Sequence, residues 1–381
     1  MPRALMLTTS LPRHPADPAG RFVAELAAAL TAHGYDLRLL APGPRHPIAG
    51  VELCAWPAPP GLFTGPGAPD NLRRRPLRAG LAAVAATAAL TAAARRHRHG
   101  ALVIAHWLVP AGLAALAVPG VRRHLVAHGS DVALLEALPA GRALARRLAR
   151  ADAITFVSAD LRDRFAALAP LPARHHVLPM GTAPLAPDPA TLARLRALAA
   201  GRRVVATVGR LVAQKGLDTL ADALAGRDDV LWIAAGDGPE RAALVARAAR
   251  ARVALHPLGA VAPPERDALL ALADAYALPS RALGRRREGT PVSLLEALAA
   301  GVPTVATDLP GPAAAARAAG ALLVPPDDPP ALRAALAAIL DDPARAAALR
   351  RRHAEAGARW RWTHLGPAHA AAFAGADVTE G

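Results

Sequence analysis

The chain has 381 residues, which is too long for one ordinary hydrophobic core and fits two domains. Hydrophobic residues make up 53% of it but aromatic residues only 3%, so the cores must be built mainly from alanine, leucine and valine. A formal charge of +15 would ordinarily indicate a nucleic-acid or anionic-membrane partner. Arginine supplies nearly all of this charge, and GC-rich codons favour arginine, alanine and proline, so codon composition explains most of it.

The cysteine content and the long apolar runs indicate the cellular compartment of the protein. Cys54 is the only cysteine, which excludes an intrachain disulfide and implies no oxidising compartment. The first ten residues lack the sustained apolar segment of a signal peptide. The uncharged runs 79–94 and 101–121 are respectively too short and too interrupted, by His106 and Pro110, to span a membrane. We therefore expect a cytoplasmic protein, with the inner face of the membrane as an alternative site.

Short apolar runs alternate with helical stretches along the chain, which predicts an α/β fold with parallel sheets covered by helices. Gly20 lies in the proline-rich loop after the first strand, and Gly34 closes the helix that follows. Pro184, Pro187 and Pro189 mark the expected domain boundary. The predicted strands are 4–9, 36–40, 51–56, 102–107, 125–128, 154–157 and 175–178 in the first half, and 204–208, 230–235, 253–256, 275–278, 303–307 and 321–324 in the second.

Two segments of the first half follow strands, where open parallel sheets bind their ligands. In HWLVPAG (106–112) we expect Trp107 and Val109 to pack in the core. In AHGSD (127–131) Asp131 is a candidate cap of the next helix, and His128 faces the crevice. A lone histidine is more often structural, but its place in a loop after a strand makes His128 a candidate site residue.

Two glycine-containing segments follow strands of the second half. GRLVAQKG (209–216) places Arg210 and Lys215 at the carboxyl end of a strand, where a guanidinium fork and an ammonium group suit a diphosphate. A solvated basic loop is the alternative, yet Lys215 is the only lysine of the chain. GDGPE (236–240) falls short of the dinucleotide fingerprint, so no nicotinamide cofactor is inferred.

The segment EGTPVSLLEALAAG (288–301) reads as an anion-binding helix start. Thr290 is the predicted N-cap and Pro291 the first helical residue, which leaves the N–H groups of the next residues free. Glu288 and Glu296 bracket this helix start. They could be the two acids of a glycoside hydrolase, but an anion-binding helix start favours a phosphate-containing donor.

Other chemistries have little support in the sequence. No Asp-x-Asp pair occurs and the histidines lack zinc spacing, so no metal site is expected. No G-x-S-x-G motif occurs, which argues against a serine nucleophile. Apart from a donor substrate, no cofactor is expected.

The motifs GRLVAQKG, GDGPE, the Glu288 to Glu296 pair and GVPTVATDLPG, preceded by HWLVPAG and AHGSD, occur in one order and spacing that resembles the retaining glycosyltransferases of family 4. The resemblance covers nearly the whole chain. It implies the GT-B arrangement, with two Rossmann-like, doubly wound parallel-sheet domains facing across a cleft. Residues 1–184 would form the acceptor-side domain and 185–356 the nucleotide-sugar-binding domain. Residues 357–381, including Trp360 and Trp362, would cross back to the first domain.

The resemblance also implies residue roles. Arg210 and Lys215 would hold the donor diphosphate, Glu296 the ribose hydroxyls, and Glu288 would face the transferred sugar. His128 would lie beside the sugar from across the cleft, and Gly20 would let the first domain approach the phosphates and the acceptor. Donor binding is thus assigned to Arg210, Lys215, Gly289, Thr290, Pro291, Val292, Ser293, Leu294, Glu296 and Gly20, and catalysis to Glu288, His128, Arg210 and Lys215.

The implied reaction moves a sugar from a UDP- or GDP-linked donor to a glycan, lipid-linked or small-molecule acceptor, as in polysaccharide biosynthesis, with retention of the anomeric configuration. No metal would be needed, because the two cations and a helix N-terminus stabilise the leaving diphosphate. Front-face attack assisted by the leaving phosphate is the family's favoured proposal.

The chain departs from the family pattern in three places. Pro179, Met180 and Gly181 stand where the family often has Pro-Asn-Gly, the usual glutamate after Gly311 is missing, and the loop 281–287 carries four arginines. These departures concern the donor and acceptor more than the reaction class.

Two rival functions remain open. A glycogen-phosphorylase-like enzyme would need a lysine for pyridoxal phosphate, and Lys215 is already matched to the phosphate position. A basic, non-catalytic GT-B protein would bind nucleic acid or an anionic membrane. Within the glycosyltransferase interpretation no nucleic-acid partner is expected. Arg73–Arg75 could hold a lipid-linked acceptor at an anionic membrane, but a solvated loop is the favoured alternative.

Overall fold

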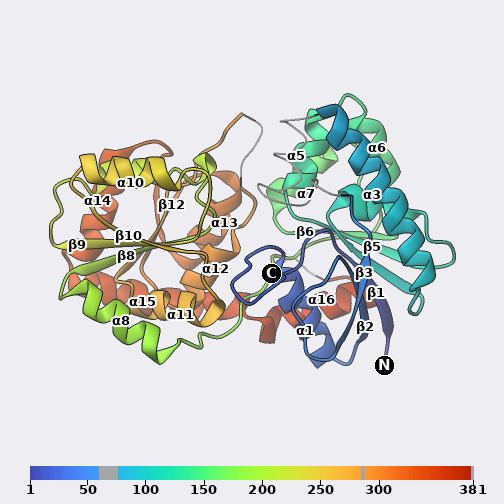
Figure 1. The fold of residues 1–381 in the computed structure, drawn as a ribbon, viewed down its shortest axis with the longest axis horizontal. Coiled ribbons are helices and arrows are strands. Elements are labelled where there is room, and N and C mark those ends of the chain that lie inside the picture. Colours follow the sequence, from blue (N-terminus) through green and yellow to red (C-terminus); the bar gives the residue numbers. More distant parts are fainter. Residues whose placement is uncertain (60–75, 285–287, 379–381) are drawn as a thin grey trace. The chain divides into compact units, whose positions relative to one another are not determined.

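The computed structural model describes residues 1–59, 76–284 and 288–378, which form two compact α/β units. Unit 1 comprises Met1–His14, Ala19–Gly181 and Trp362–Gly381, and unit 2 comprises Pro15–Pro18 and Thr182–Arg361 (Figure 1). The chain therefore passes from unit 1 to unit 2 after Gly181 and returns after Arg361. The sequence-based boundaries were set after residues 184 and 356.

Unit 1 is built on a parallel sheet with the order β3-β2-β1-β4-β5-β6-β7 among the described residues. The first strand, β1, pairs with β2 on one side and β4 on the other, so the strand order reverses between β1 and β4. Chain connections diverge at such a switch point and leave a crevice outside the carboxyl ends of the strands. The strands are β1 (Arg3–Leu7), β2 (Asp36–Pro42), β3 (Val51–Trp56), β4 (Leu102–His106), β5 (Arg122–Ala127), β6 (Ala153–Phe156) and β7 (His175–Val177).

The last helix of the chain belongs to unit 1, where it packs against α1 (Figure 1). The Trp362 indole N–H donates to Glu25 Oε2 at 3.2 Å, and the Tyr35 hydroxyl donates to the Ala370 carbonyl at 3.0 Å. The described helical segments are α1 (Arg21–Ala32), α3 (Pro76–Arg96), η1 (Leu108–Gly112), α4 (Leu113–Leu116), α5 (Ser130–Ala137), α6 (Gly141–Leu148), α7 (Ala159–Ala166) and α16 (Trp362–Ala374).

Gly181 has a packing role at the junction. A Cβ atom there would come within 2.5 Å of the Trp362 ring, so only glycine fits beneath the indole. The next residue, Thr182, donates its N–H to the Trp360 carbonyl at 2.8 Å, within unit 2. The glycine of the Pro-Met-Gly segment is thus explained by the return of the chain at Trp362.

Unit 2 is built on a second parallel sheet, with the order β10-β9-β8-β11-β12-β13 in the described part of the chain. Its order reverses between β8 and β11, and helices cover both faces, with α10 on one side and α8 and α11 on the other (Figure 1). The strands are β8 (Arg203–Val208), β9 (Val230–Ala235), β10 (Ala254–Gly259), β11 (Ala275–Leu278), β12 (Thr304–Thr307) and β13 (Leu322–Val324). The helical segments are α8 (Pro189–Ala199), η2 (Ala213–Lys215), α9 (Leu217–Ala223), α10 (Arg241–Arg250), α11 (Pro263–Leu272), α12 (Val292–Ala299), α13 (Pro310–Ala319), α14 (Pro329–Leu340), α15 (Pro343–Gly357) and η3 (Ala358–Trp360).

The predicted α/β fold class is confirmed. Each predicted strand is present among the described residues, and Val51–Trp56, Val230–Ala235 and Ala275–Leu278 have the predicted ends. Alanine, leucine and valine dominate the core of unit 2, as expected, and Trp232 at its centre donates its indole N–H to Thr207 Oγ1 at 3.0 Å. No helix within residues 1–59, 76–284 and 288–378 has both the length and the apolar character needed to cross a lipid bilayer.

Unit 1 buries several histidines that the sequence did not mark as core residues. His124 donates to or accepts from Thr155 Oγ1 at 2.7 Å and stacks on His176, with 5.8 Å between the ring centroids. Burial lowers the pKa of His106 to about 3 and that of His369 to about 4, and it holds the pKa of His124 well below its usual value. These imidazoles are therefore uncharged at neutral pH.

We predict that unit 1 loses stability as the pH falls below about 6.5, the ordinary pKa of an unfolded histidine. Below that pH the unfolded chain binds more protons than the folded chain. The free energy of unfolding therefore falls by about 1.4 kcal/mol per pH unit for each such histidine until the pKa of that histidine in the folded protein is reached. Burial raises the pKa of Asp131, so this carboxyl binds a proton more readily in the folded protein and partly opposes the loss of stability at low pH. Urea denaturation between pH 8 and pH 5, with hydrogen exchange at β4 and β5, measures the slope. A flat profile above pH 5.5 would contradict the prediction.

Candidate functional site

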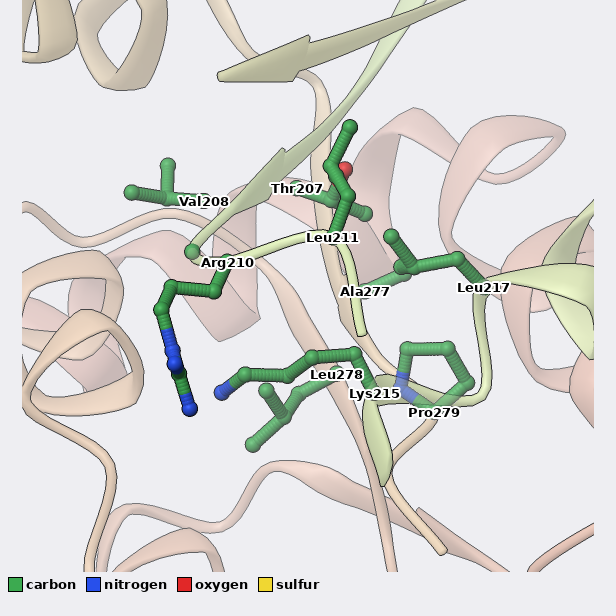
Figure 2. Close-up of a pocket in the computed structure, with 10 residues that line it drawn as sticks. Thr207, Val208, Arg210, Leu211, Lys215, Leu217, Ala277, Leu278 and Pro279 are labelled. Atoms are coloured by element: carbon green, nitrogen blue, oxygen red, sulfur yellow. The ribbon is translucent and has the colours of Figure 1, made fainter. Parts of the chain in front are cut away.

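A loop at the carboxyl end of β8 presents two cations. Arg210 and Lys215 line one pocket with the ends of β8 and β11, and their charged groups point toward each other (Figure 2). Gly216 has a φ of +59°, and a Cβ atom there would lie 1.9 Å from the Pro279 carbonyl oxygen. The loop therefore packs closely on the end of β11. The predicted pair of cations is present at this switch point.

Glu288 reaches the same loop from a different part of unit 2. Its Oε1 lies 2.7 Å from Lys215 Nζ, and the two side chains are only 10% and 15% exposed. A largely buried ion pair is favourable when its geometry is good, and removing one partner leaves a costly unpaired charge. The structure thus joins the two residues that the sequence had placed in separate motifs.

The helix after Glu288 begins one residue later than predicted. Pro291 is the N-cap of α12, because its backbone is extended (φ −66°, ψ 128°) and its carbonyl oxygen accepts the N–H groups of Leu294 and Leu295. The prediction that Thr290 is the N-cap is therefore wrong, because Thr290 lies one residue outside the first helical hydrogen bonds. The positive end of the helix dipole still lies next to Glu288 in sequence.

The glycine of GVPTVATDLPG fixes the chain around Glu288. A Cβ atom on Gly311 would lie 2.1 Å from the carbonyl oxygen of Glu288 and 2.3 Å from that of Gly289. Gly311 is the second residue of α13, so the start of this helix packs directly on the loop that carries Glu288. This contact explains why the motif needs glycine at that position.

Glu296 belongs to a buried ionic cluster with two residues of α11 that sequence reasoning missed. Arg266 pairs with Glu296 Oε1 and with Asp267 Oδ1, the latter at 2.8 Å from its Nη2. Asp267 also accepts the N–H of Ala186 at 2.9 Å. Arg266 is 3% exposed, so its charge is compensated by these carboxylates. The available signal was the run of three charged residues, Glu265 to Asp267, before the apolar end of α11.

Tyr276 was also missed, although it is one of only two tyrosines in the chain. It lies fully buried on β11, with its hydroxyl 3.5 Å from the Val208 carbonyl oxygen and hydrogen-bonded to Ser293. Burial raises the pKa of this phenol, so Tyr276 stays protonated. It connects the end of β8 with the first turn of α12.

In unit 1, the carboxylate of Asp131 joins the loops that follow β4 and β5. It accepts the N–H groups of Leu108 at 3.0 Å, Gly129 at 2.8 Å and Val132 at 3.0 Å, and that of His128 at 3.2 Å. Asp131 therefore does more than cap a helix, because Leu108 lies in the other loop. Its bonds fix the two loops relative to each other.

His128 lies among aromatic side chains at this edge of the unit 1 sheet. Its ring centroid is 4.8 Å from that of Phe22, 4.9 Å from that of Trp107 and 5.2 Å from that of His106. Trp107 has an unusual backbone φ of +68° for a bulky residue. Trp107 and Val109 are only partly buried, so the prediction that they pack in the core is wrong.

The structure of unit 1 explains why residue 20 is a glycine. Gly20 is the N-cap of α1 with a φ of +66°, and a Cβ atom there would lie 2.1 Å from the Ser10 carbonyl oxygen. The loop after β1 consequently packs on itself just before Phe22. Its predicted role toward phosphates and acceptor stays a prediction.

The remaining sequence-based inferences concern the basic loops and the expected independence of metal. Arg281 forms ion pairs with Asp218 at 2.7 Å and Asp327 at 2.6 Å. Arg73–Arg75 and Arg285–Arg287 lie outside the described residues. Within the described residues no three histidine, cysteine, aspartate or glutamate side chains gather as a metal site requires, and independence of metal stays a prediction.

Comparison with known proteins matches both halves of the chain to sequence families. The profile of Glycosyltransferase Family 4 matches residues 19–184, and that of Glycosyl transferases group 1 matches residues 194–360. The chain belongs to glycosyltransferase family 4.

Relatives of this family 4 chain include mannosyltransferases. It is 37% identical over 219 residues to the GDP-mannose-dependent alpha-(1-6)-phosphatidylinositol monomannoside mannosyltransferase of Mycobacterium tuberculosis, a match covering 52% of this chain and 57% of the relative. The enzyme of the same name from Mycolicibacterium smegmatis is 38% identical over 201 residues, with 49% and 52% covered. The chain thus matches little more than half the length of these relatives.

Solved structures show the same fold. Sucrose-phosphate synthase from Thermosynechococcus elongatus aligns with a TM-score of 0.78 and 18% identity, covering 98% of each chain. HepE from Anabaena, solved in complex with UDP and glucose, aligns with a TM-score of 0.74 and 20% identity over 98% of this chain and 99% of HepE. The predicted fold of two Rossmann-like units, GT-B, is confirmed for this family 4 glycosyltransferase.

The residues assigned by the family resemblance divide between the two units. Unit 2 carries Arg210 and Lys215 beside Glu288, and the segment from Gly289 to Leu294 that leads into and begins α12. It also carries Glu296, whose carboxylate pairs with Arg266. His128 and Gly20 lie in unit 1.

We predict that Arg266→Met destabilises the protein by about 3 kcal/mol or more, because it leaves Glu296 and Asp267 as buried carboxylates without their cation. Urea denaturation at pH 7 measures the loss. Arg351→Met is the matched control, since Arg351 lies exposed on α15 of the same unit. Equal stability of the two variants would show that Arg266 does not hold this cluster together.

Proposed function

We propose that this family 4 glycosyltransferase transfers a hexose from a UDP- or GDP-linked donor to a glycan, lipid-linked or small-molecule acceptor, with retention and without a metal. The observation that carries the proposal is the position of Lys215, which lines a pocket with Arg210 at the switch point of the unit 2 sheet and pairs with Glu288. Family membership supports the reaction class. The contacts of unit 2 support the residue roles.

A nucleoside diphosphate is the ligand whose charge best fits this loop. Arg210 offers a planar fork and Lys215 a point charge, and both extend from the β8 loop into one pocket (Figure 2). The N-terminus of α12 adds a positive partial charge. As the sugar leaves, negative charge develops on the diphosphate, and fixed donors of this kind lower the barrier. This is the work that a metal ion does at other transferases.

Glu288 is proposed to face the transferred sugar. Because its carboxylate pairs with Lys215, it lies beside the place where the diphosphate would bind. When a diphosphate also binds the Lys215 ammonium group, the Glu288 carboxylate has oxygen lone pairs left to accept hydrogen bonds from sugar hydroxyls. Glu296 is proposed to bind the ribose hydroxyls, with Arg266 holding its carboxylate.

Retention is proposed to follow front-face attack. The bond between the anomeric carbon and the phosphate oxygen breaks, and the acceptor oxygen bonds to the anomeric carbon on the same face. The acceptor's proton passes to the departing phosphate oxygen. Glu288 is already paired with Lys215, which suits it to binding a hydroxyl better than to attacking the anomeric carbon.

The relatives narrow the donors and acceptors to test first. The mycobacterial enzymes are GDP-mannose-dependent and act on a phosphatidylinositol mannoside, and HepE was solved with UDP and glucose. We therefore propose GDP-mannose and UDP-glucose as first donors. A lipid-linked acceptor at an anionic cytoplasmic membrane surface would suit the net charge of +15.

We predict that Lys215→Met weakens binding of the donor nucleotide by about ten- to a hundredfold, the range expected for one charge-assisted hydrogen bond to phosphate. Isothermal titration with GDP and UDP measures the affinity, and the stabilisation of melting temperature by each nucleotide sugar ranks the donors. An affinity equal to that of the wild-type protein would remove Lys215 from the diphosphate site.

Glu288→Gln is expected to abolish sugar transfer while donor binding persists or tightens. The amide keeps the shape of the side chain but releases Lys215 from its internal counter-ion, so the diphosphate gains an unshared cation. Product formation from radiolabelled donor and nucleotide affinity are measured on the same preparation. Transfer at the wild-type rate would show that Glu288 has no essential role.

The non-catalytic alternative makes the opposite prediction. A basic binding protein of this fold would bind no nucleotide sugar but would bind nucleic acid or anionic vesicles with steep salt dependence. The same donor titrations, repeated with duplex DNA and with vesicles at two salt concentrations, separate the two functions.

A further inference from the structure

His106, at the end of β4, contacts His128 through one ring nitrogen of each residue. His106 Nδ1 lies 2.9 Å from His128 Nε2, and the two rings are inclined by only 18°. His106 is fully buried, whereas His128 is partly exposed. A contact of this length between two neutral imidazoles requires one N–H donor and one bare nitrogen.

Both rings are neutral under physiological conditions. Burial lowers the pKa of His106 to about 3, and burial together with His106 holds the pKa of His128 well below its usual value. Each imidazole then carries a single proton, so the proton in the contact fixes the tautomer of both rings.

The second nitrogen of His106 decides which ring donates. His106 Nε2 is buried and has no hydrogen-bond partner among the described residues. If His128 donated, His106 would carry its proton on Nε2, which would be a buried N–H without an acceptor. Such orphaned donors are rarer than unpaired acceptors. The favoured arrangement has His106 Nδ1–H donating to a bare His128 Nε2.

We propose that His106 is a positioning residue, which holds His128 in the tautomer that carries its proton on Nδ1. His128 Nδ1 makes no hydrogen bond within the described residues and is not enclosed, so its N–H is available at the carboxyl end of β5. Asp131 fixes the backbone of His128 and of Leu108, two residues after His106, so the two rings keep their register.

The functional meaning of this tautomer rests on the proposed glycosyltransferase function. A neutral imidazole with Nδ1–H is a hydrogen-bond donor toward a sugar hydroxyl oxygen and remains so across the physiological pH range. The opposite tautomer would present a bare nitrogen and accept instead. Phe22 and Trp107 both pack against His128 and contact each other, which restricts rotation of the His128 ring.

The tautomer can be tested without any substrate. Long-range proton–nitrogen correlation spectra of the full chain, labelled with ¹⁵N-histidine, distinguish protonated from bare ring nitrogens between pH 6 and pH 8. His128 is assigned from the spectrum of His128→Asn. We expect a protonated Nδ1 and a bare Nε2 at His128 across this range. A protonated Nε2 at His128 overturns the proposal.

Two substitutions test the role of His106. In His106→Asn the amide can replace the Nδ1–H donor, so the His128 tautomer and the transfer rate should be kept. In His106→Leu the donor is lost, and we expect His128 to shift toward an Nε2 proton and kcat to fall about tenfold, with donor affinity unchanged. An unchanged His128 spectrum and rate in His106→Leu would overturn the proposal.

His124→Asn is the matched control, because His124 is equally buried in unit 1 but contacts Thr155 rather than His128. It should lower stability without changing the His128 spectrum. If the wild-type protein transfers no sugar from any nucleotide donor, the proposed function fails, and the spectra alone then decide the tautomer.

Discussion

The ion pair between Lys215 and Glu288 is the interaction on which the unit 2 site depends. It joins the loop after β8 to the loop before α12, and both side chains are largely buried. Burying this ion pair costs desolvation energy, so the two charged groups must be held in good geometry. Glycines allow the two loops to pack closely where no Cβ atom fits, with Gly216 against Pro279 and Gly311 against Glu288 and Gly289. The charged centre is therefore set by backbone packing at the carboxyl ends of parallel strands.

Behind this centre lies a layer of buried polar groups. Tyr276 contacts both the end of β8 and the first turn of α12, while Arg266, which also pairs with Asp267, holds Glu296 on α12. Buried charges persist only where partners compensate them, so this layer ties the orientation of α12 to α11 and β11. A donor that bound both Glu288 and Glu296 would enter a site whose shape is already set by these buried contacts.

Unit 1 uses a buried carboxylate and uncharged histidines at the corresponding edge of its sheet. The buried carboxylate of Asp131 accepts four backbone N–H groups from two loops, and the ring of His106 contacts that of His128 at the same edge. The edge of this sheet consequently offers aromatic faces and imidazole nitrogens rather than charge. That character suits contact with sugar hydroxyls, whereas the cations of unit 2 suit phosphate.

The sequence by itself determined the two parallel sheets, because apolar runs of strand length alternate with helical stretches and glycines follow them. It also placed Arg210, Lys215 and Glu288 in motifs at strand ends. It could not show that Lys215 meets Glu288, that Arg266 meets Glu296 or that His106 meets His128, since each pair comes from different elements. It misplaced the N-cap of α12 at Thr290, because local residue preference does not reveal which carbonyl accepts the first helical bonds. Strand order decided these contacts, since only the folded sheet brings distant loops to one edge.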